Sequence, residues 1–342
     1  MRRVLLALIA VTAWLALAAP ARVATAPRRA RLSADLLHHQ QSRARHKARV
    51  IVHGDRARLR EIAARHRLRL VRELEHEGVF EADAAEIDAL AAEAGIDHLS
   101  GDAPVGSFMS VSNKSTAADQ TRSGTSGLLG IGSISGVTGK GIGIALLDSG
   151  ISSHKALGTR VVASVNFASG DPGVTDDFGH GTHIAGIITG SASAASKVTT
   201  AYAGGIAPGA HLVNVRVLGP RGTGLTSDVI AGIDWVIANR SKYNIRIINL
   251  SLGHSVMEPV AFDPLCEAVE RAYRAGIVVV ASAGNRGKAE DGAPILGGIT
   301  SPGNSPYAVT VGALNTWNTV SRSDDSVTTY SSRGPTRFDL AV

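Results

Sequence analysis

The chain has 342 residues, of which 44% are hydrophobic and 19% are charged, and its formal net charge is +6. These values are typical of a globular protein of about two domains and exclude a disordered chain. The aromatic content of 4% argues against a surface that stacks nucleic-acid bases. The first 49 residues hold ten Lys or Arg and one Asp, so the positive charge indicates no nucleic-acid partner for the rest of the chain.

Residues 1–26 are predicted to be a signal peptide with its processing region. Arg2 and Arg3 precede an apolar run over residues 4–19, and Ala19-Pro20-Ala21 follows as a cleavage signal. The alternative is a membrane anchor, but the run is shorter than the roughly 20 residues that span a bilayer. The pattern therefore predicts a secreted or extracytoplasmic protein without membrane contact after signal cleavage.

Residues 27–46 are predicted to be a basic leader, and residues 47–105 a small separate domain. Within 47–105 the spacing of the apolar residues alternates between a period of 2, typical of strands, and a period of 3.6, typical of helices. It predicts the order strand, helix, strand, strand, helix, strand. This order predicts a ferredoxin-like α+β unit. Residues 106–138 are rich in Ser, Gly and Thr, which is typical of a linker and processing region.

Residues 139–342 are predicted to form a second domain of the α/β class. Continuous apolar runs predict strands at 142–147, 211–217, 245–250, 277–281 and 308–313. Such unbroken runs are typical of strands that are buried on both faces. Helical patterns over 181–189, 225–239 and 263–275 alternate with them, so a doubly wound, mostly parallel sheet is expected. The single Cys266 permits no intramolecular disulfide, and its helical context predicts a small buried side chain.

Asp148 follows the first of these strands and precedes Ser149-Gly150. It should therefore lie at the carboxyl edge of the sheet, where open α/β folds place their sites. Taken alone, this motif is also typical of a capping or turn aspartate. An aspartic protease would need a second Asp-Ser-Gly or Asp-Thr-Gly, which the sequence lacks.

His180 is surrounded by small residues in the stretch GHGTHIAG, residues 179–186. A general base must approach both its carboxylate and its nucleophile within about 3 Å, and glycines leave room for this approach. A metal site on His180 and His183 is the alternative, but no nearby Glu or Cys completes a ligand set. Asn285 follows the strand 277–281, where its amide could donate to a developing oxyanion.

Six motifs appear in one order between residues 139 and 336: ALLDSG, HGTHIAG, GIAPGAHLVNVRVL, INLSLG, ASAGN and YSSRGPT. Together they resemble the subtilisin-like serine proteases, the subtilase or peptidase S8 family. The resemblance implies a subtilisin-like fold and serine endopeptidase activity on polypeptide substrates. It also implies that residues 47–105 are an inhibitor-I9-like propeptide that acts as an intramolecular inhibitor in a zymogen.

The resemblance assigns roles to individual residues. It implies that Asp148 orients His180, that His180 is the general base, and that Asn285 belongs to the oxyanion hole. Ser251-Leu252-Gly253 would flank the S1 pocket, and Gly222-Thr223-Gly224 would pair with the main chain of an extended peptide.

The sequence departs from the family pattern at the nucleophile. The family places its Ser in Gly-Thr-Ser-Met-Ala after the oxyanion Asn, and no such segment is present. This predicts a chain that is truncated before the catalytic Ser and inactive as given, with an apolar part of the sheet left uncovered. The alternative is a noncatalytic, peptide-binding relative. Lys155-Ala156 replace the Pro-Asp with which many subtilases bind calcium, so neither a metal nor another cofactor is predicted.

Overall fold

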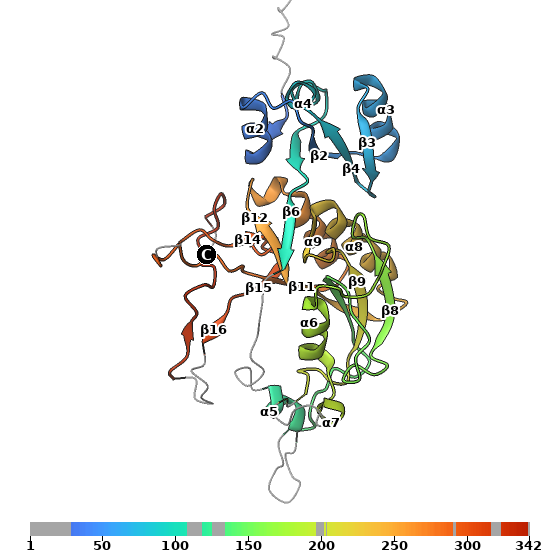
Figure 1. Cartoon of the computed structure of the whole chain (residues 1–342), viewed down its shortest axis with the longest axis vertical. Helices are drawn as coiled ribbons and strands as arrows, with labels where there is room; N and C mark the ends of the chain where they lie inside the picture. Colours follow the sequence, from blue (N-terminus) through green and yellow to red (C-terminus); the bar gives the residue numbers. More distant parts are fainter. Residues whose placement is uncertain are drawn as a thin grey trace, which may run out of the picture.

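The computed structural model describes residues 29–107, 118–124, 134–195, 202, 204–289, 292–315 and 323–340. The predicted signal peptide and much of the predicted linker lie outside these residues. The described chain forms a small N-terminal unit and a larger unit that strand β6 joins (Figure 1). Within the described residues, no helix has the length and apolar character needed to cross a membrane.

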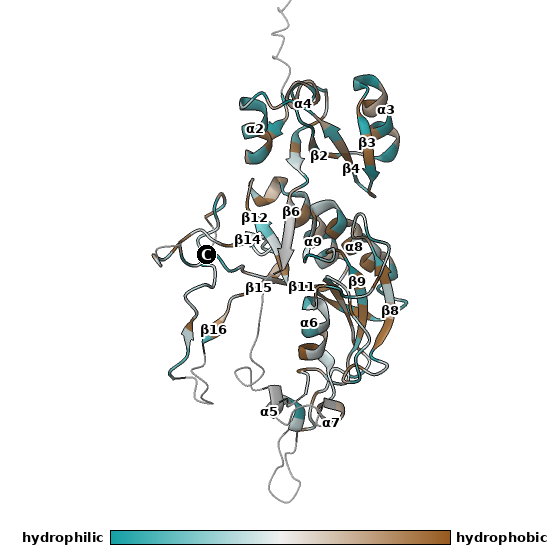
Figure 2. Ribbon diagram, viewed as in Figure 1, coloured by the Kyte–Doolittle hydropathy of each residue, from teal (hydrophilic) through white to brown (hydrophobic). Residues whose placement is uncertain are grey.

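The N-terminal unit is a four-stranded antiparallel sheet with two helices, extended by one short strand. Its elements are β2 (Ala48–His53), α3 (Arg56–His66), β3 (Arg69–Glu73), β4 (Glu77–Ala82), α4 (Ala84–Ala91) and β5 (His98–Gly101). The strand order β5-β2-β4-β3 is that of the expected ferredoxin-like arrangement. Figure 2 shows that α3 is largely hydrophilic on its surface.

Part of the predicted basic leader belongs to this unit. β1 (Arg31–Leu32) pairs in parallel with β5, and α2 (Ala34–Gln41) packs against α4. Leu36 of α2 is only 1% exposed and lies in the core of the unit. Apolar residues between the basic ones therefore hold residues 31–41 on the fold, instead of leaving them as a solvated leader.

The larger unit is built on a six-stranded, fully parallel sheet, which confirms the predicted α/β doubly wound class. Its strand order is β15-β13-β11-β7-β9-β8. The strands are β7 (Gly143–Asp148), β8 (Val161–Asn166), β9 (His211–Arg216), β11 (Ile245–Leu250), β13 (Val278–Ser282) and β15 (Ala308–Val311). Only β8 was not predicted, because it is an edge strand whose side chains alternate between partly buried and exposed.

Helices cover the two faces of this sheet (Figure 1). α8 (Thr226–Asn239) and α9 (Pro264–Arg274) pack on one face, where Ala145 and Leu147 of β7 are fully buried. α6 (His180–Thr189) packs on the other face against Ile144 and Leu146. Alternate residues of β7 thus serve two separate cores. Cys266 of α9 is buried as predicted, and burial raises the pKa of its thiol.

The face that α6 covers is only partly covered by the described residues. Beyond β11, the side chains of Val278, Val309 and Val311 are 50%, 54% and 44% exposed. These valines lie on β13 and β15, in register with the α6 side of the sheet. The expected uncovered apolar surface is therefore present in this part of the chain.

A second, antiparallel sheet links the two units. Its strand order is β10-β6-β12-β14, and its members are β10 (Thr223–Leu225), β6 (Pro104–Ser107), β12 (Leu252–Ser255) and β14 (Thr300–Ser301). β6 leaves the N-terminal unit and lies between two strands of the larger unit. The remaining short elements are α5 (Ala118–Ser123), α7 (Ala192–Ala195), the 3-10 turn η2 (Val260–Phe262), β16 (Leu314–Asn315) and β17 (Ser326–Val327).

Two glycines of α6 allow a test of how closely this helix packs against the turn after β7. A Cβ atom at Gly181 would lie 2.1 Å from the backbone oxygen of Gly150, whereas one at Gly186 would have no neighbour within 4 Å. We expect Gly181→Ala to destabilise the fold by about 2 kcal/mol through overpacking. Gly186→Ala should be neutral or stabilising by up to about 1 kcal/mol, because alanine has the higher helix propensity. Thermal unfolding of both variants measures this, and equal melting temperatures would contradict it.

Candidate active site

Asp148 and His180 come together at the carboxyl edge of the parallel sheet. Asp148 is the last residue of β7, and its backbone oxygen accepts hydrogen bonds from the amides of Val217 and Leu218 at 2.9 and 3.1 Å. His180 is the first residue of α6. The end of a strand and the start of a helix therefore fix the two side chains, as open α/β sheets do at their sites.

The carboxylate of Asp148 contacts one nitrogen of the His180 ring. Nδ1 of His180 lies 2.7 Å from Oδ1 and 2.9 Å from Oδ2 of Asp148. The two residues are 1% and 4% exposed. A carboxylate only accepts, so Nδ1 donates, and Nε2 becomes the nitrogen that can take and return a proton. The amide of Ser149 adds a second donor to Oδ1 at 2.7 Å.

Asp176 supports this pair and was missed by the sequence analysis. Its carboxylate accepts hydrogen bonds from the hydroxyl of Ser149 and from the amides of Gly179 and Thr182, each at 2.7 Å. It thereby ties the first turn of α6 to the residue next to Asp148. Burial by itself would raise the pKa of Asp176, but the hydrogen bonds from Thr182, Ser149 and Gly179 outweigh it and lower the pKa.

The sequence carries little signal for Asp176, because Asp177 stands beside it. The structure separates the two: Asp176 is 8% exposed, whereas the side chain of Asp177 is 56% exposed and pairs with Arg216 at 3.5 Å. A carboxylate just before a helix often caps it, and this pattern was the available sequence signal for Asp176. Only the folded loop decides which of the two neighbours points inward.

Arg216 is the largest fully buried side chain among the described residues, and it holds the loop that leads to α6. Its guanidinium donates to the carboxylate of Asp171 at 2.6 Å and to the backbone oxygens of Gly173 and Leu218 at 3.1 and 3.2 Å. A buried charge with this many partners is compensated, and the planar guanidinium holds its partners in fixed directions. These contacts of Arg216 therefore hold the loop over residues 171–179 in place at the edge of the sheet.

Asn285 lies at the same edge of the sheet, beyond the end of β13. It is exposed, and the preceding Gly284 has a φ of +100°. A Cβ at Gly284 would lie 2.8 Å from the side chain of Thr300, so the turn that presents Asn285 requires glycine. β11 separates β13 from β7, which places the two strand ends about 10 Å apart.

The predicted peptide-binding segments flank one extended strand. Thr223 and Gly224 pair with Gly106 and Val105 of β6, and on its other side Leu252 and Gly253 pair with Ser107 and Gly106. Ser251 precedes β12, and its hydroxyl accepts from the side chain of Asn249 at 2.9 Å. A Cβ at Gly222 would lie 2.4 Å from the ring of Phe178. That ring lies 6.5 Å from the ring of His180, so β10 runs close to the Asp148–His180 pair.

The residues weighed as alternatives do not gather at this site. His183 is exposed while His180 is buried. In the part of the chain that the structure describes, the one group of three acidic or histidine side chains close enough to share an ion lies elsewhere, at His53, Glu77 and Glu267. Ser331 and Ser332 are buried and accept hydrogen bonds from the amides of Ala313 and Arg286 at 3.0 Å, which is a structural role.

A buried carboxylate on the Nδ1 side of a histidine, at the edge of a parallel sheet, is an arrangement found in hydrolases that use a nucleophilic side chain. Residues 139–342 match the family described as the subtilase family. The chain is 40% identical over 211 residues to serine protease AprX of Bacillus subtilis (strain 168), covering 59% of this chain and 45% of that protein.

Two further proteins are similar to this chain. The chain is 37% identical over 180 residues to subtilisin Savinase of Lederbergia lenta, covering 53% of this chain and 58% of that protein. A solved structure, an S41 psychrophilic protease, is similar with 35% identity and a TM-score of 0.49, covering 58% of this chain and 60% of that chain. The chain spans about half the length of the curated relatives it matches. It belongs to the subtilase family.

Substitution of Asp176 tests its positioning role. Asp176→Asn replaces one accepting oxygen with a donor and removes the charge, so hydrogen bonds to the start of α6 and to Ser149 are lost. We expect the melting temperature to fall, by an amount that corresponds to about 2 kcal/mol. The matched control is Asp177→Asn on the exposed neighbour, which should change stability by less than about 0.5 kcal/mol. Equal effects of the two variants would contradict the assignment.

Proposed function

We propose that this protein is an exported serine endopeptidase made as a zymogen, in which Asp148 and His180 supply the acid and base. The observation that carries the proposal is the contact of the Asp148 carboxylate with Nδ1 of His180 at 2.7 Å. Membership of the subtilase family supports the reaction class. The signal-peptide pattern of residues 1–26 supports export.

In the proposed reaction, Nε2 of His180 takes the proton of a serine hydroxyl and later gives it to the leaving amine. Asp148 holds the ring in place and stabilises the imidazolium that forms. The side-chain amide of Asn285 donates to the oxyanion, a contribution of roughly 10²–10³ in rate when measured for the corresponding group in subtilisin itself. The printed sequence holds no Ser in the family context. We therefore expect residues 1–342 alone to cleave no peptide.

The backbone of β6 supports a role for the N-terminal unit as an inhibitor. β6 is hydrogen-bonded on one side to β10 and on the other to β12, and both pairings are antiparallel. This is the way in which an extended peptide adds to exposed strand edges. A substrate would compete for the same edges, so the segment that follows the N-terminal unit blocks the proposed substrate cleft.

Polar contacts dock the N-terminal unit on the start of α8. The carboxylate of Asp102 accepts from the amide and the hydroxyl of Ser227 at 2.9 and 2.8 Å, and from Arg49 at 2.7 Å. Arg72 pairs with Asp228, the next residue of the same first turn. Anionic groups are favoured at a helix N-terminus, so Asp102 serves as an external cap for α8. These contacts support docking of the unit on its own catalytic unit.

The alternative is a noncatalytic peptide-binding protein of the same family. The complete pair of strands β10 and β12 around β6 favours it, because peptide capture needs these edges and no nucleophile. The two functions differ in one respect only, which is whether a serine reacts.

A fluorophosphonate probe distinguishes the two functions. We expect labelling of the protein isolated from its natural host, and none of residues 1–342 produced alone. His180→Ala should abolish labelling of the natural protein, since the hydroxyl then lacks its base. Labelling of residues 1–342 that His180→Ala removes would overturn the expected inactivity. An unlabelled natural protein that still binds extended peptides would support the alternative.

A buried His–Glu pair lies between the two units. His98 of β5 contacts the carboxyl group of Glu258 in the larger unit, which also accepts from Ser100 at 3.0 Å. Burial is the largest cause of two opposite shifts: it raises the pKa of Glu258 to about 9 and lowers the pKa of His98 to about 4. Asp263 and Asp35 add to the upward shift of Glu258 and oppose the downward shift of His98, whereas His53 and Arg31 add to the shift of His98.

We expect docking to weaken as pH rises above neutrality. The docked pKa of Glu258 is higher than its ordinary value of 4.5, so docking takes up a proton and loses this stabilisation as pH rises toward 9. The lowered pKa of His98 affects docking only below pH 6.5, the ordinary pKa of histidine, because the ring is neutral above that pH in both the docked and the undocked state. Between pH 7 and 9 the docking equilibrium should therefore fall by up to about tenfold per pH unit. Hydrogen exchange of the β6 and β12 amides, corrected for intrinsic rates, measures this.

Glu258→Gln is the matched control, because its amide can still donate to Nε2 of His98 but does not titrate. Its exchange protection should stay constant across the same pH range. An equal loss of protection in this variant and in the parent chain would show that another group is responsible.

A further inference from the structure

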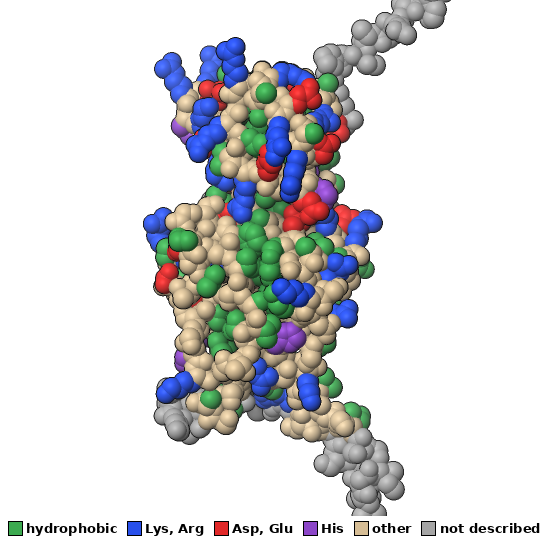
Figure 3. All heavy atoms as spheres, turned by 90° about the vertical axis from the view of Figure 1, so that its right-hand side faces the viewer, with side chains coloured by type: hydrophobic (Ala, Val, Ile, Leu, Met, Phe, Trp, Pro, Cys, Tyr) green, Lys and Arg blue, Asp and Glu red, His purple; other side chains and the backbone are tan. Residues whose placement is uncertain are grey.

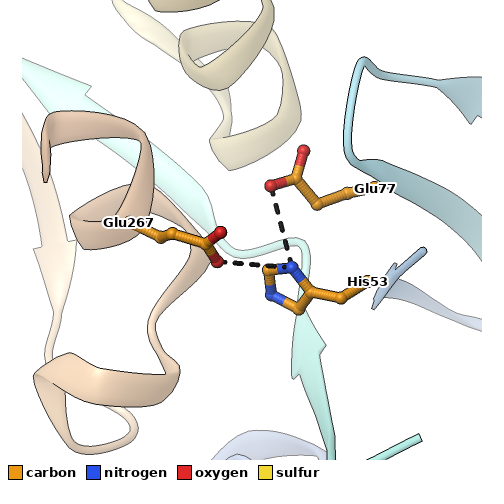
Figure 4. Close-up of side chains that lie close together, drawn as sticks. All are labelled: His53, Glu77 and Glu267. Atoms are coloured by element: carbon orange, nitrogen blue, oxygen red, sulfur yellow. Dashed lines mark ion pairs between the residues drawn. The ribbon is translucent and has the colours of Figure 1, made fainter. Parts of the chain in front are cut away.

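A second cluster of titratable side chains lies where the two units meet, away from the Asp148–His180 pair. His53 ends β2, and its register partner on β4 is Glu77, so both belong to the N-terminal unit. Glu267 belongs to the first turn of α9 in the larger unit. Figure 4 shows the ring of His53 between the two carboxylates, with both ion pairs ending on the same ring nitrogen.

The distances in this cluster fit ligands around an ion. Nδ1 of His53 lies 3.3 Å from Oε2 of Glu267 and 3.8 Å from Oε1 of Glu77, and the three ligand atoms lie within 4.8 Å of one another. Tetrahedral zinc, with ligands 2.0–2.2 Å away, separates its ligand atoms by about 3.4 Å. A single N–H at Nδ1 cannot point at two carboxylates, whereas an ion between them can be shared by all three.

The charges of the cluster do not balance. Arg271 approaches Oε1 of Glu77 at 3.2 Å, Oε1 of Glu267 at 3.5 Å and Oδ1 of Asp234 at 3.0 Å. One guanidinium thus faces three carboxylates. Burial is the largest cause that raises the pKa of Glu77 to about 7, although Arg271 opposes this shift. A divalent cation beside the three carboxylates would add the positive charge that the single guanidinium does not supply.

Glu77 has one buried oxygen without a partner. Its Oε1 faces His53 and accepts from Arg271 at 3.2 Å, whereas its Oε2 has no hydrogen-bond partner, although the side chain is 0% exposed. One guanidinium contact leaves a buried carboxylate incompletely compensated, and an ion bound at this carboxylate would complete it. Glu267 already uses different oxygens for Arg271 and for His53, so binding of an ion at Oε2 of Glu267 leaves its pair with Arg271 in place.

The cluster is open enough for an ion to enter. The side chains of His53 and Glu267 are 34% and 45% exposed, while Glu77 forms the buried side. Water could therefore supply the fourth ligand of a tetrahedral site. One imidazole and two carboxylates suit zinc and its neighbours in the first transition row, whereas calcium and magnesium prefer oxygen ligands alone.

We propose that His53, Glu77 and Glu267 form a zinc site that clamps the N-terminal unit to the larger unit. Two ligands come from one unit and one from the other, so the bound ion would hold the units together. Opening of the interface would then require loss of the ion or of Glu267 from its coordination. This proposal does not rest on proteolytic activity, and its test needs no reactive serine.

Zinc chloride titrated into the untagged chain at neutral pH tests the site by calorimetry. The untagged form is needed because a polyhistidine tag would itself bind zinc and add to the 12 His residues of the chain. We expect one ion per chain, with affinity reduced at least about tenfold by Glu267→Gln and by His53→Gln. Zinc should also slow hydrogen exchange in β6 and β12, because the ion binds only the docked arrangement with all three ligands.

The matched control is His76→Gln, which changes the neighbouring exposed pair of His76 and Glu75, 3.9 Å apart with side chains 53% and 63% exposed. It should leave zinc affinity within about twofold of the parent chain. Circular dichroism verifies that each variant is folded, and the visible spectrum of Co²⁺ bound to the parent chain reports tetrahedral coordination without any substitution. Absence of zinc binding, binding that survives both ligand substitutions, or an octahedral cobalt spectrum would overturn the proposal.

Discussion

The pairing of the Asp148 carboxylate with Nδ1 of His180 is the constraint on which the rest of the larger unit depends. Both side chains are buried, so the charge of Asp148 is tolerated only because His180 and the amide of Ser149 donate to it. This requires α6 to begin directly against the turn after β7. Gly181 makes that approach sterically possible, and Asp176 holds it by bonding to both sides. The geometry of the Asp148–His180 pair thus depends on how closely the backbone of α6 approaches the turn after β7, as well as on the two side chains.

The contact between the two units has a different character. It combines strand pairing along β6 and polar clusters around Asp102, Glu258 and Glu267 with the buried apolar side chains of Ile51, Leu74 and Val79, which join the core of the larger unit. Figure 3 shows charged side chains of both signs on the N-terminal unit, and a band of hydrophobic side chains with few charges on the β8 side of the larger unit. The polar clusters contain titratable groups, so protons and ions can influence this docking.

Sequence patterns predicted the elements of the large sheet closely. Continuous apolar runs identified five of its six strands, since strands that are covered on both faces carry no polar alternation. The stripe of Val229, Ile230, Ile233 and Val236 likewise identified α8. The resemblance of their motifs to the subtilase family implied that Asp148 pairs with His180, and the structure places the two side chains in contact. Asp176 could not be separated from Asp177, because the two differ only in which way the folded loop turns them.

By itself, the sequence determined the α/β class, the order of the strands and helices along the chain, and the two motifs that hold Asp148 and His180. The spacing of hydrophobic residues and the residue types at turns are properties of residues that are close in the sequence, so they can be recognised without knowing the fold. The tertiary structure decided the pairings of residues far apart in the chain: β6 between β10 and β12, His98 with Glu258, and Glu267 with His53. Such contacts depend on how whole units dock, because burial and charge compensation arise only when distant surfaces meet.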